Sequence, residues 1–284
     1  MDIIRVSHLT KTYKDITAVN NLSFTVKQGQ LFSFLGPNGA GKSTTINTLC
    51  TLLDYEKGEI IIDGHDLKTN SGQVRQAIGV VFQESLLDPI LTVRENLYTR
   101  AGLYASTRRQ RNQLVSEVQQ AIDLSDIIDR PYGLLSGGQR RRADVAASLI
   151  HKPKVLFLDE PTTGLDPQTR QSIWQTLTHL RETQGMTLFL TTHYMEEAAA
   201  SDYIVVIDHG QVAAQGTPTQ LKTQYASDQL VMETTTGRKV VSLTKTTDAI
   251  DILNQCRDQI TSFEVRQGSM DDVFLNITGR SIRV

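Results

Sequence analysis

The sequence predicts an α/β fold in which a mixed β-sheet is covered by helices, followed by a small α+β unit. Two observations carry this prediction. The apolar runs at residues 155–158, 187–190 and 203–207 are continuous, and segments of helical spacing separate them. Continuous apolar runs are typical of strands that are buried on both faces of a parallel sheet. Strands that alternate with helices in this way are typical of α/β proteins.

A mainly β region and then a helical region precede these strands. Thr92 and Glu95 have capping-box spacing, so a helix is expected to begin at Thr92. The polar residues 106–120 predict an exposed helix, and we expect residues 84–150 to form a helical subdomain. After Gly41 the apolar residues at positions 46, 49, 50 and 53 have the spacing of a helix. The β-rich runs of this half are residues 3–6, 22–26, 31–35, 60–62 and 78–82.

The alternation of strand and helix breaks near residue 217, and the rest of the chain consists of shorter, more polar pieces. We place a domain boundary within residues 217–225, which gives a main domain at 1–220 and an accessory domain at 221–284. The accessory domain holds no motif whose chemistry we recognise. Its expected elements are a turn, two strands and a helix, at residues 234–237, 240–243, 263–265 and 248–256, respectively.

Charge, cysteine content and hydropathy narrow the class of function. The chain has 29 Lys and Arg against 31 Asp and Glu, so no basic field favours a nucleic acid as partner. Cys50 and Cys256 are the only cysteines, which disfavours a disulfide scaffold or a zinc site and fits a reducing cytoplasm. The longest apolar run is residues 203–207, whereas a membrane span needs ~20 such residues. The N-terminal residues lack a secretory signal, so we expect a chain that does not cross a bilayer alone.

A phosphate-binding motif occupies residues 36–43, which read G-P-N-G-A-G-K-S and match G-x-x-x-x-G-K-[ST]. It lies directly after a predicted strand and directly before a predicted helix. The glycines let backbone N–H groups point inward at a polyphosphate, and the helix N-terminus adds its positive dipole end. Lys42 would reach the β- and γ-phosphates, and the Ser43 hydroxyl would ligate Mg²⁺. The alternative is a strand-helix turn without a ligand, which the two flanking elements disfavour.

An acidic pair follows the buried run 155–158. Asp159 would hold Mg²⁺ directly or through a water, and Glu160 is a candidate base for the attacking water. Alone, such a pair could instead cap a helix ahead of Pro161. The phosphate loop makes that alternative weaker, and together the two motifs predict nucleotide hydrolysis.

The pentapeptide at residues 135–139, L-S-G-G-Q, adds a third motif. Ser136 would cap a helix whose N-terminus, with the backbone of Gly137 and Gly138, can bind a γ-phosphate. A lone S-G-G would indicate an ordinary helix cap. With the other two motifs in this order, the sequence resembles the ATP-binding-cassette (ABC) ATPases over about residues 1–220. The resemblance implies a P-loop NTPase fold with a mixed sheet and a helical subdomain.

Four more residues resemble family positions, and the resemblance implies their roles. Tyr13 lies where the family stacks an aromatic ring on adenine, and Gln83 resembles the Q-loop glutamine, which contacts Mg²⁺ and links the site to a membrane partner. Asp166 belongs to a G-L-D segment that resembles the D-loop, and His193 resembles the switch histidine that contacts the γ-phosphate. Taken singly, these would be a strand aromatic, a surface glutamine, a turn residue and a structural histidine.

Within the family, the sequence is similar to the ATP-binding subunits of bacterial drug exporters of the daunorubicin-resistance type. The similarity lies in residues 34–42, 140–142, 192–198 and 270–279.

Three places depart from the pattern of that group. Ser33 stands where Gly is usual, Ala147 stands where Arg is common, and residues 201–203 read Ser-Asp-Tyr in place of a Cys-Asp-Arg-like segment. None of them is a phosphate ligand, so they bear on subgroup and substrate and leave the ATPase chemistry intact.

The resemblance implies an ATP-hydrolysing subunit, with ATP and Mg²⁺ as cofactors, that powers a separate membrane permease for the export of drugs or other hydrophobic compounds. It would lie at the cytoplasmic face of the cell membrane, held there through the permease. The permease would dock on residues 84–96, where Leu86, Leu87, Ile90 and Leu91 offer apolar contacts. The alternative is a soluble ABC ATPase that acts in translation or nucleic-acid maintenance without a permease.

Two copies are expected to form one working unit, because the family places the phosphate loop and the signature peptide of one site in opposing subunits and this chain has one of each. The copies would close head to tail on two Mg-ATP molecules. Catalytic roles are expected for Glu160, His193 and Lys42, and Mg²⁺ contacts for Ser43, Gln83 and Asp159. The expected nucleotide-binding residues are Tyr13, Gly36, Pro37, Asn38, Gly39, Ala40, Gly41, Lys42, Ser43, Thr44, Gln83, Ser136, Gly137, Gly138, Gln139 and Asp166.

Overall fold

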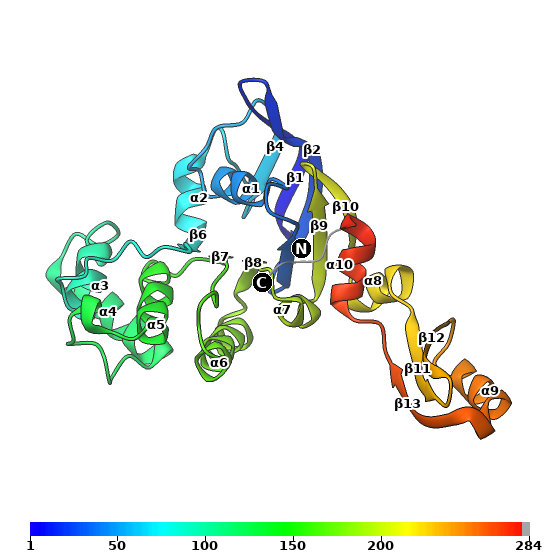
Figure 1. The fold of residues 1–284 in the computed structure, drawn as a ribbon. Helices are drawn as coiled ribbons and strands as arrows, with labels where there is room; N and C mark the ends of the chain where they lie inside the picture. The colour runs from blue at the N-terminus through cyan, green and yellow to red at the C-terminus, as the bar shows by residue number, and fades with distance from the viewer. Residues whose placement is uncertain (280–284) are drawn as a thin grey trace.

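The structure is a computed structural model that describes residues 1–279. The last five residues of the predicted accessory domain 221–284 lie outside the described residues. Three β-sheets are present within the described part of the chain, and helices pack between and around them (Figure 1). In Figure 1 a group of helices projects on one side of the central sheets, and a small C-terminal sheet projects on the other.

The central sheet has six strands among the described residues. Five of them are parallel, and one edge strand runs antiparallel to its neighbour, so the predicted mixed sheet is confirmed. The three continuous apolar runs of the sequence are interior strands of this sheet, as expected. In spatial order the strands are β10 (Gln211–Gly216), β9 (Tyr203–Asp208), β3 (Leu31–Leu35), β8 (Thr187–Thr191), β7 (Val155–Asp159) and β6 (Ile78–Val81).

An antiparallel sheet is formed by the N-terminal part of the chain. The run predicted at residues 3–6 lies near the start of one strand of twelve residues, and the run at 22–26 lies near the end of another. The strands extend further than expected because their partly exposed ends pair in a hairpin without an apolar pattern to mark them. In spatial order the strands are β2 (Ile16–Lys27), β1 (Asp2–Tyr13), β4 (Lys57–Ile62) and β5 (His65–Asp66).

Helix α1 (Lys42–Leu49) shares one hydrophobic core with both sheets. Ile46 and Leu49 of α1 are buried in the same cluster as the aromatic rings of Phe24 in β2 and Phe32 in β3, whose centroids are 5.6 Å apart. The predicted helical spacing continued to position 53, but the helix ends at Leu49. Thr51 has a left-handed φ of 63°, which breaks the helix before the last apolar position is reached.

Three helices of the region between β6 and β7 begin with a capping box, and the sequence analysis identified the caps at Thr92 and Ser136 but not the one at Thr107. Thr92, Thr107 and Ser136 each form a capping box at a helix N-terminus, which confirms the helix expected at Thr92. The region is preceded by α2 (Ser71–Ala77), which the sequence analysis did not identify. Its members are α3 (Val93–Ala101), α4 (Arg108–Ile122), the short 3-10 turn η1 (Tyr132–Leu134) and α5 (Gly137–Ser148).

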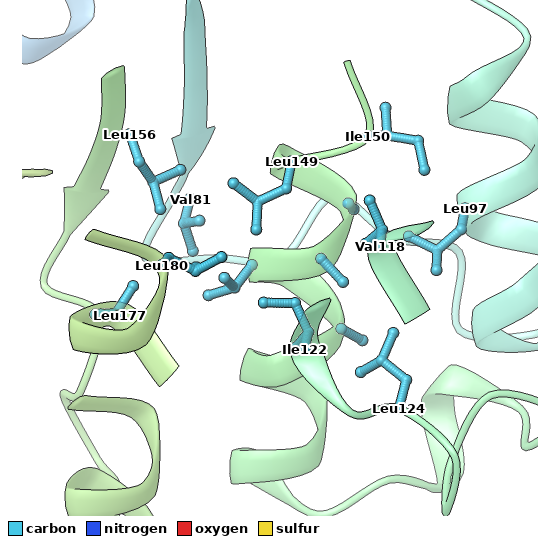
Figure 2. Close-up of a cluster of buried hydrophobic side chains, with 14 of the residues drawn as sticks. Val81, Leu97, Val118, Ile122, Leu124, Leu149, Ile150, Leu156, Leu177 and Leu180 are labelled. Atoms are coloured by element: carbon cyan, nitrogen blue, oxygen red, sulfur yellow. The ribbon is translucent and has the colours of Figure 1, made fainter. Parts of the chain in front are cut away.

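One continuous core joins this helical region to the central sheet. Figure 2 shows Leu149, next to α5, with Leu156 of β7 and Leu180 of α6 (Pro167–Gln184) on one side and Val118 of α4 on the other. All four side chains are buried in the same cluster. We propose that residues 84–150 act as a functional subdomain. Their hydrophobic core is nevertheless continuous with that of the strands that carry the site.

The C-terminal part contains a three-stranded antiparallel sheet with its own small core, formed by Leu230, Met232, Leu243 and Ala249. The turn expected at residues 234–237 joins its first two strands. The C-terminal elements are α8 (Pro218–Tyr225), β11 (Asp228–Thr234), β12 (Gly237–Leu243), α9 (Asp248–Gln255), η2 (Arg257–Gln259), β13 (Ile260–Arg266) and α10 (Met270–Thr278).

Helices α8 and α10 pack against the main domain, which differs from the predicted division at residues 220 and 221. Leu221 of α8 and Phe274 of α10 share a buried cluster with Leu35 of β3 and with Met195 of α7 (Met195–Ala199). The chain thus leaves the main domain after α8 and returns to it at α10. We propose that the small accessory unit comprises residues 228–266. Among residues 1–279, no helix has the length and apolar character needed to cross a bilayer.

Candidate functional site

The carboxyl ends of three neighbouring parallel strands define the site. β3, β8 and β7 lie side by side in that order, and each is followed by a sequence-predicted segment. Residues 36–43 follow β3, His193 follows β8, and Asp159 and Glu160 lie at the end of β7. Ligands of open α/β sheets bind at this edge of parallel strands. The fold therefore brings the phosphate motif, the acidic pair and the histidine to one place.

Two glycines of the phosphate loop are required by its close contacts. Gly41, directly before α1, has a φ of 103°, and a Cβ there would lie 2.5 Å from the carbonyl oxygen of Ala18. At Gly36 a Cβ would lie 2.5 Å from the carbonyl oxygen of Ile207. No side chain fits at either distance, so the loop can follow this path only with glycine. This agrees with the glycine spacing that identified the motif.

Lys42 is folded back over its own loop. Its ammonium donates to the carbonyl oxygens of Gly36, at 2.6 Å, and Pro37, at 3.1 Å. Burial lowers the pKa of Lys42, and the nearby carboxylates of Glu160 and Asp159 oppose that shift. The ammonium thus lies within electrostatic reach of the acidic pair.

The acidic pair is held by β8. The Thr191 hydroxyl donates to Asp159 Oδ1 at 2.6 Å, and the Glu160 N–H donates to the carbonyl oxygen of Thr191 at 3.1 Å. Glu160 has a left-handed φ of 46°, which turns the chain sharply at the end of β7. The next helix along the chain is α6, whose N-cap is Asp166. Asp159 and Glu160 therefore cap no helix, and the alternative explanation of the pair is wrong.

Glu160 and His193 meet at the site. Glu160 Oε2 lies 3.4 Å from His193 Nδ1, and the Thr163 hydroxyl donates to the same oxygen at 3.2 Å. Both side chains are partly exposed. A carboxylate that is oriented by neighbours and open on one side is suited to accept a proton from a water molecule.

The remaining predicted residues occupy exposed or half-exposed positions at the rim. Tyr13 is the last residue of β1 and is 43% exposed, Ser43 lies in the first turn of α1, and Gln83 is exposed just after β6. Asp166 caps α6 and accepts a hydrogen bond from the Thr169 N–H at 3.0 Å.

The signature peptide lies apart from the phosphate loop of the same chain. Ser136 caps α5, and the Gln139 side chain accepts the Ser136 N–H at 3.1 Å to complete the capping box. Figure 1 shows α5 in the projecting group of helices, separated from α1 by the sheet strands. The structure therefore does not bring the two predicted phosphate-binding motifs together within one chain.

The sequence analysis did not identify Arg141, although the side chain of Arg141 contacts backbone atoms of the site directly. Its buried guanidinium donates to the carbonyl oxygens of Phe82, Asp159, Glu160 and Pro161, at 2.5–3.2 Å. Burial lowers the pKa of this guanidinium. The side chain of one residue in α5 thus fixes both the segment before Gln83 and the backbone of the acidic pair. Arg141 shares one face of α5 with the buried Val145 and Ser148, at i+4 and i+7, but the sequence alone does not show that its charged side chain points inward.

Glu197 is a second residue that the sequence analysis did not identify. Its buried carboxylate accepts hydrogen bonds from the hydroxyls of Thr162 and Thr192 and from Trp174 Nε1. Thr162 follows the acidic pair in sequence and Thr192 precedes His193. No local motif marks such a residue, because its donors come from three separate segments.

The fold and these motifs define the class of P-loop nucleotide-binding domains, and comparison with solved structures makes the class narrower. The chain is similar to the dimeric, ADP- and Pi-bound ATP-binding cassette MJ0796, with a TM-score of 0.68 and 30% identity over 76% of this chain and 98% of that one. It is also similar to cbiO1 of Clostridium perfringens, part of the ABC transporter complex cbiONQ. There the TM-score is 0.72 and the identity 29%, over 78% of this chain and 90% of that one.

Sequence comparison identifies the family. The model of the ABC transporter family matches residues 19–163. The linearmycin resistance ATP-binding protein LnrL of Bacillus subtilis is 34% identical, over 99% of this chain and 100% of that protein. The daunorubicin/doxorubicin resistance ATP-binding protein DrrA of Streptomyces peucetius is 36% identical, over 97% of this chain and 92% of that protein. The chain therefore belongs to the ABC transporter family and carries its ATP-binding domain.

Another relative is longer than this chain. The probable multidrug ABC transporter ATP-binding protein YbhF of Escherichia coli is 40% identical over 227 residues, which are 80% of this chain but 39% of YbhF.

Proposed function

We propose that this chain is the ATP-hydrolysing subunit of an exporter whose membrane-spanning permease is a separate protein. The observation that carries the proposal is the grouping of Lys42, Glu160 and His193 at the ends of three adjacent strands. The distance of 3.4 Å between Glu160 Oε2 and His193 Nδ1 is the core of this grouping. The rest of the proposal assigns roles to residues around it.

The residues around the phosphate loop fit an Mg²⁺ ion together with the ATP phosphates. The Ser43 hydroxyl, the Asp159 carboxylate and the Gln83 amide offer only oxygen ligands, which Mg²⁺ prefers. Thr191 orients the Asp159 carboxylate by its hydrogen bond at 2.6 Å. Held by these residues, Mg²⁺ would supply positive charge that offsets the negative charge of the phosphates.

Each catalytic residue has a role that its environment supports. Lys42 binds the β- and γ-phosphates with the loop N–H groups, Glu160 accepts the proton of the attacking water, and His193 holds the γ-phosphate. Tyr13 stacks on the adenine, which suits its exposed ring at the end of β1. Because Glu160 Oε2 accepts from Thr163 and lies beside His193, its carboxylate is oriented before ATP binds.

A second copy of the chain completes each site. Ser136 and the N-terminus of α5 lie away from the phosphate loop of their own chain (Figure 1), so they are free to contact ATP that is bound to another. Two copies that close head to tail would place each signature peptide on the γ-phosphate of the other copy. Hydrolysis then removes charge from that contact, and the pair opens.

The permease docks on the groove beside Gln83. A shallow, open groove lies between β6, the segment after Gln83, α3 and α5, and Leu86, Arg100 and Ala147 are among its lining residues. Leu86 and Ile90 are 69% and 84% exposed, which suits a contact with a partner. Leu87, in contrast, packs against the core of the helical region. The chain would therefore lie at the cytoplasmic face of the membrane through this contact.

The transported compounds are proposed from the names of the relatives. LnrL is a linearmycin resistance protein and DrrA a daunorubicin/doxorubicin resistance protein, so we propose drugs or similar hydrophobic compounds as cargo. The permease and not this chain would contact the cargo.

The test is a pull-down of tagged Glu160→Gln protein from detergent-solubilised native membranes in the presence of Mg-ATP. We expect a multi-spanning protein to co-purify in stoichiometric amount, and expect it to be lost when Mg-ATP is omitted or when Leu86 and Ile90 are both changed to Asp. Recovery of ribosomes or DNA without a membrane protein would overturn the exporter and favour a soluble ATPase in translation or nucleic-acid maintenance.

A further inference from the structure

The segment that carries His193 touches helix α6 at two points. α6 begins at Pro167, directly after the N-cap Asp166, and the segment that carries His193 lies between β8 and α7. Arg170 and Trp174 make the two contacts. They are four residues apart, so they lie on one face of the helix.

The first contact is a stack of three side chains. The Arg170 guanidinium carbon lies 3.9 Å from the centroid of the Tyr194 ring, and the Tyr194 and His193 ring centroids are 4.2 Å apart with a tilt of 37°. Arg170 Nε is buried and finds no hydrogen-bond partner within residues 1–279. The cation–π contact therefore sets the position of this guanidinium, and through the Tyr194 ring it limits the orientation of the imidazole.

The second contact runs from Trp174 through Glu197 to Thr192, the residue before His193. Trp174 Nε1 donates to Glu197 Oε1 at 3.0 Å, and the Thr192 hydroxyl donates to Glu197 Oε2 at 2.6 Å. The Thr192 hydroxyl also accepts the Tyr194 N–H at 2.9 Å, which closes the turn around His193. Both sequence neighbours of His193 thus contact α6. Thr192 is connected to Trp174 through hydrogen bonds to Glu197, and the Tyr194 ring stacks on Arg170.

We propose that Arg170 and Trp174 are positioning residues for His193, so that α6 sets the orientation of the imidazole. Neither residue reaches the reacting atoms. They act through Tyr194 and Glu197. The inference rests on the proposed ATPase function, in which His193 holds the γ-phosphate.

The experiment uses the full chain and measures steady-state ATP hydrolysis with Mg-ATP. Arg170→Ala removes the cation from the stack, and Trp174→Phe keeps an aromatic ring but removes the N–H that Glu197 accepts. We expect each variant to lower kcat about three- to tenfold and to change the KM for ATP less than about twofold, because the contacts act on the γ-phosphate end alone. Gln171→Ala is the matched control, since Gln171 is an exposed neighbour on the same helix.

Two further measurements separate positioning from a general loss of structure. Tyr194→Phe keeps the stacked ring and should retain kcat within about twofold of the wild type, whereas Tyr194→Ala should lose it about tenfold. The NMR resonance of the His193 ring, assigned by its loss in His193→Gln, should move in Arg170→Ala and Trp174→Phe and stay in place in Gln171→Ala.

The experiment distinguishes a failure of the positioning role from a failure of the proposed ATPase function. If the wild type hydrolyses ATP and His193→Gln does not, but Arg170→Ala and Trp174→Phe match the wild type in kcat and in the His193 resonance, the positioning role is wrong and the function stands. Equal losses of kcat in Tyr194→Phe and Tyr194→Ala would also overturn it. A wild type that does not hydrolyse ATP overturns the function itself.

Discussion

The hydroxyl of Ser33 in β3 lies 2.5 Å from the hydroxyl of Ser201, which precedes β9, and both side chains are buried. These are two of the positions at which the sequence analysis expects a departure from the pattern of the drug-exporter group. The Ser201 hydroxyl also donates to the carbonyl oxygen of Glu197 at 3.3 Å. The Ser33 hydroxyl therefore donates to Ser201, and the Ser201 hydroxyl donates in turn to Glu197, in the segment that follows His193. Each of the two buried hydroxyls therefore has a hydrogen-bond partner inside the core.

This hydrogen-bond chain predicts an asymmetry between two substitutions. Ser201→Ala leaves the buried Ser33 hydroxyl without its acceptor and should lower the free energy of unfolding by about 1–3 kcal/mol. Ser33→Ala leaves Ser201 bonded to Glu197 and should cost about 0.5–1.5 kcal/mol. The double variant should cost less than the sum of the two, because the second substitution then removes no additional partner.

Urea unfolding of the four proteins measures this coupling, with Ser227→Ala in an exposed loop as the control. Equal costs for the two single variants, or strictly additive costs in the double variant, would contradict the direction of the bonds.

Glu160→Gln should stop turnover while ATP binding remains. The amide keeps the shape of the side chain and can still contact Thr163 and His193, but it cannot accept a proton from water at neutral pH. We expect kcat to fall about a hundredfold or more and the Kd for Mg-ATP to change less than about threefold. Glu182→Gln, at an exposed position of α6, is the control for the loss of one negative charge. Steady-state hydrolysis by Glu160→Gln near the wild-type rate would exclude Glu160 as the base.

The parts of the fold and site that could be predicted are those set by neighbours in sequence. The phosphate loop needs glycine where a Cβ would strike Ala18 or Ile207, so its spacing is visible in the sequence. The capping boxes at Thr92 and Ser136 are also local, and the continuous apolar run of β7 reports burial on both faces.

The parts that could not be predicted depend on contacts between distant segments. Three arginines stand together at positions 140–142, and only the fold shows that Arg141 turns inward to carbonyl groups of β7 and of the segment before Gln83. The return of α10 to the main domain likewise depends on its contacts with α7, α8 and β10, which no stretch of sequence near Met270 reports.

Arg141→Lys should destabilise the chain and slow hydrolysis together. A lysine ammonium can reach some of the four carbonyl oxygens but cannot match the planar fork that contacts all of them. We expect a loss of about 2–3 kcal/mol in unfolding free energy and a lower kcat, because the backbone of Asp159 and Glu160 loses its support. Arg109→Lys, on the exposed face of α4, should change neither quantity. An unchanged stability in Arg141→Lys would show that the carbonyl groups find other donors.

Asp144 gives a prediction for pH. Burial raises the pKa of this carboxyl above its usual value, although hydrogen bonds from Ser85, at 2.5 Å, and Tyr132, at 3.1 Å, oppose the shift. A raised pKa in the folded state means that the folded protein holds this proton more tightly than the unfolded chain does. The contribution of Asp144 to stability is therefore complete below the unfolded pKa and is lost as the pH rises through the folded pKa.

Asp144→Asn removes this titration and keeps an oxygen that can accept from Ser85 and Tyr132. Relative to the wild type, the variant should gain stability as the pH rises from about 4 through the raised pKa of Asp144, and the difference should be constant at higher pH. Urea unfolding across that pH range measures the difference, with Asp258→Asn at an exposed position as control. A variant that loses stability relative to the wild type over the same range would mean that the hydrogen bonds, and not burial, dominate the pKa of Asp144.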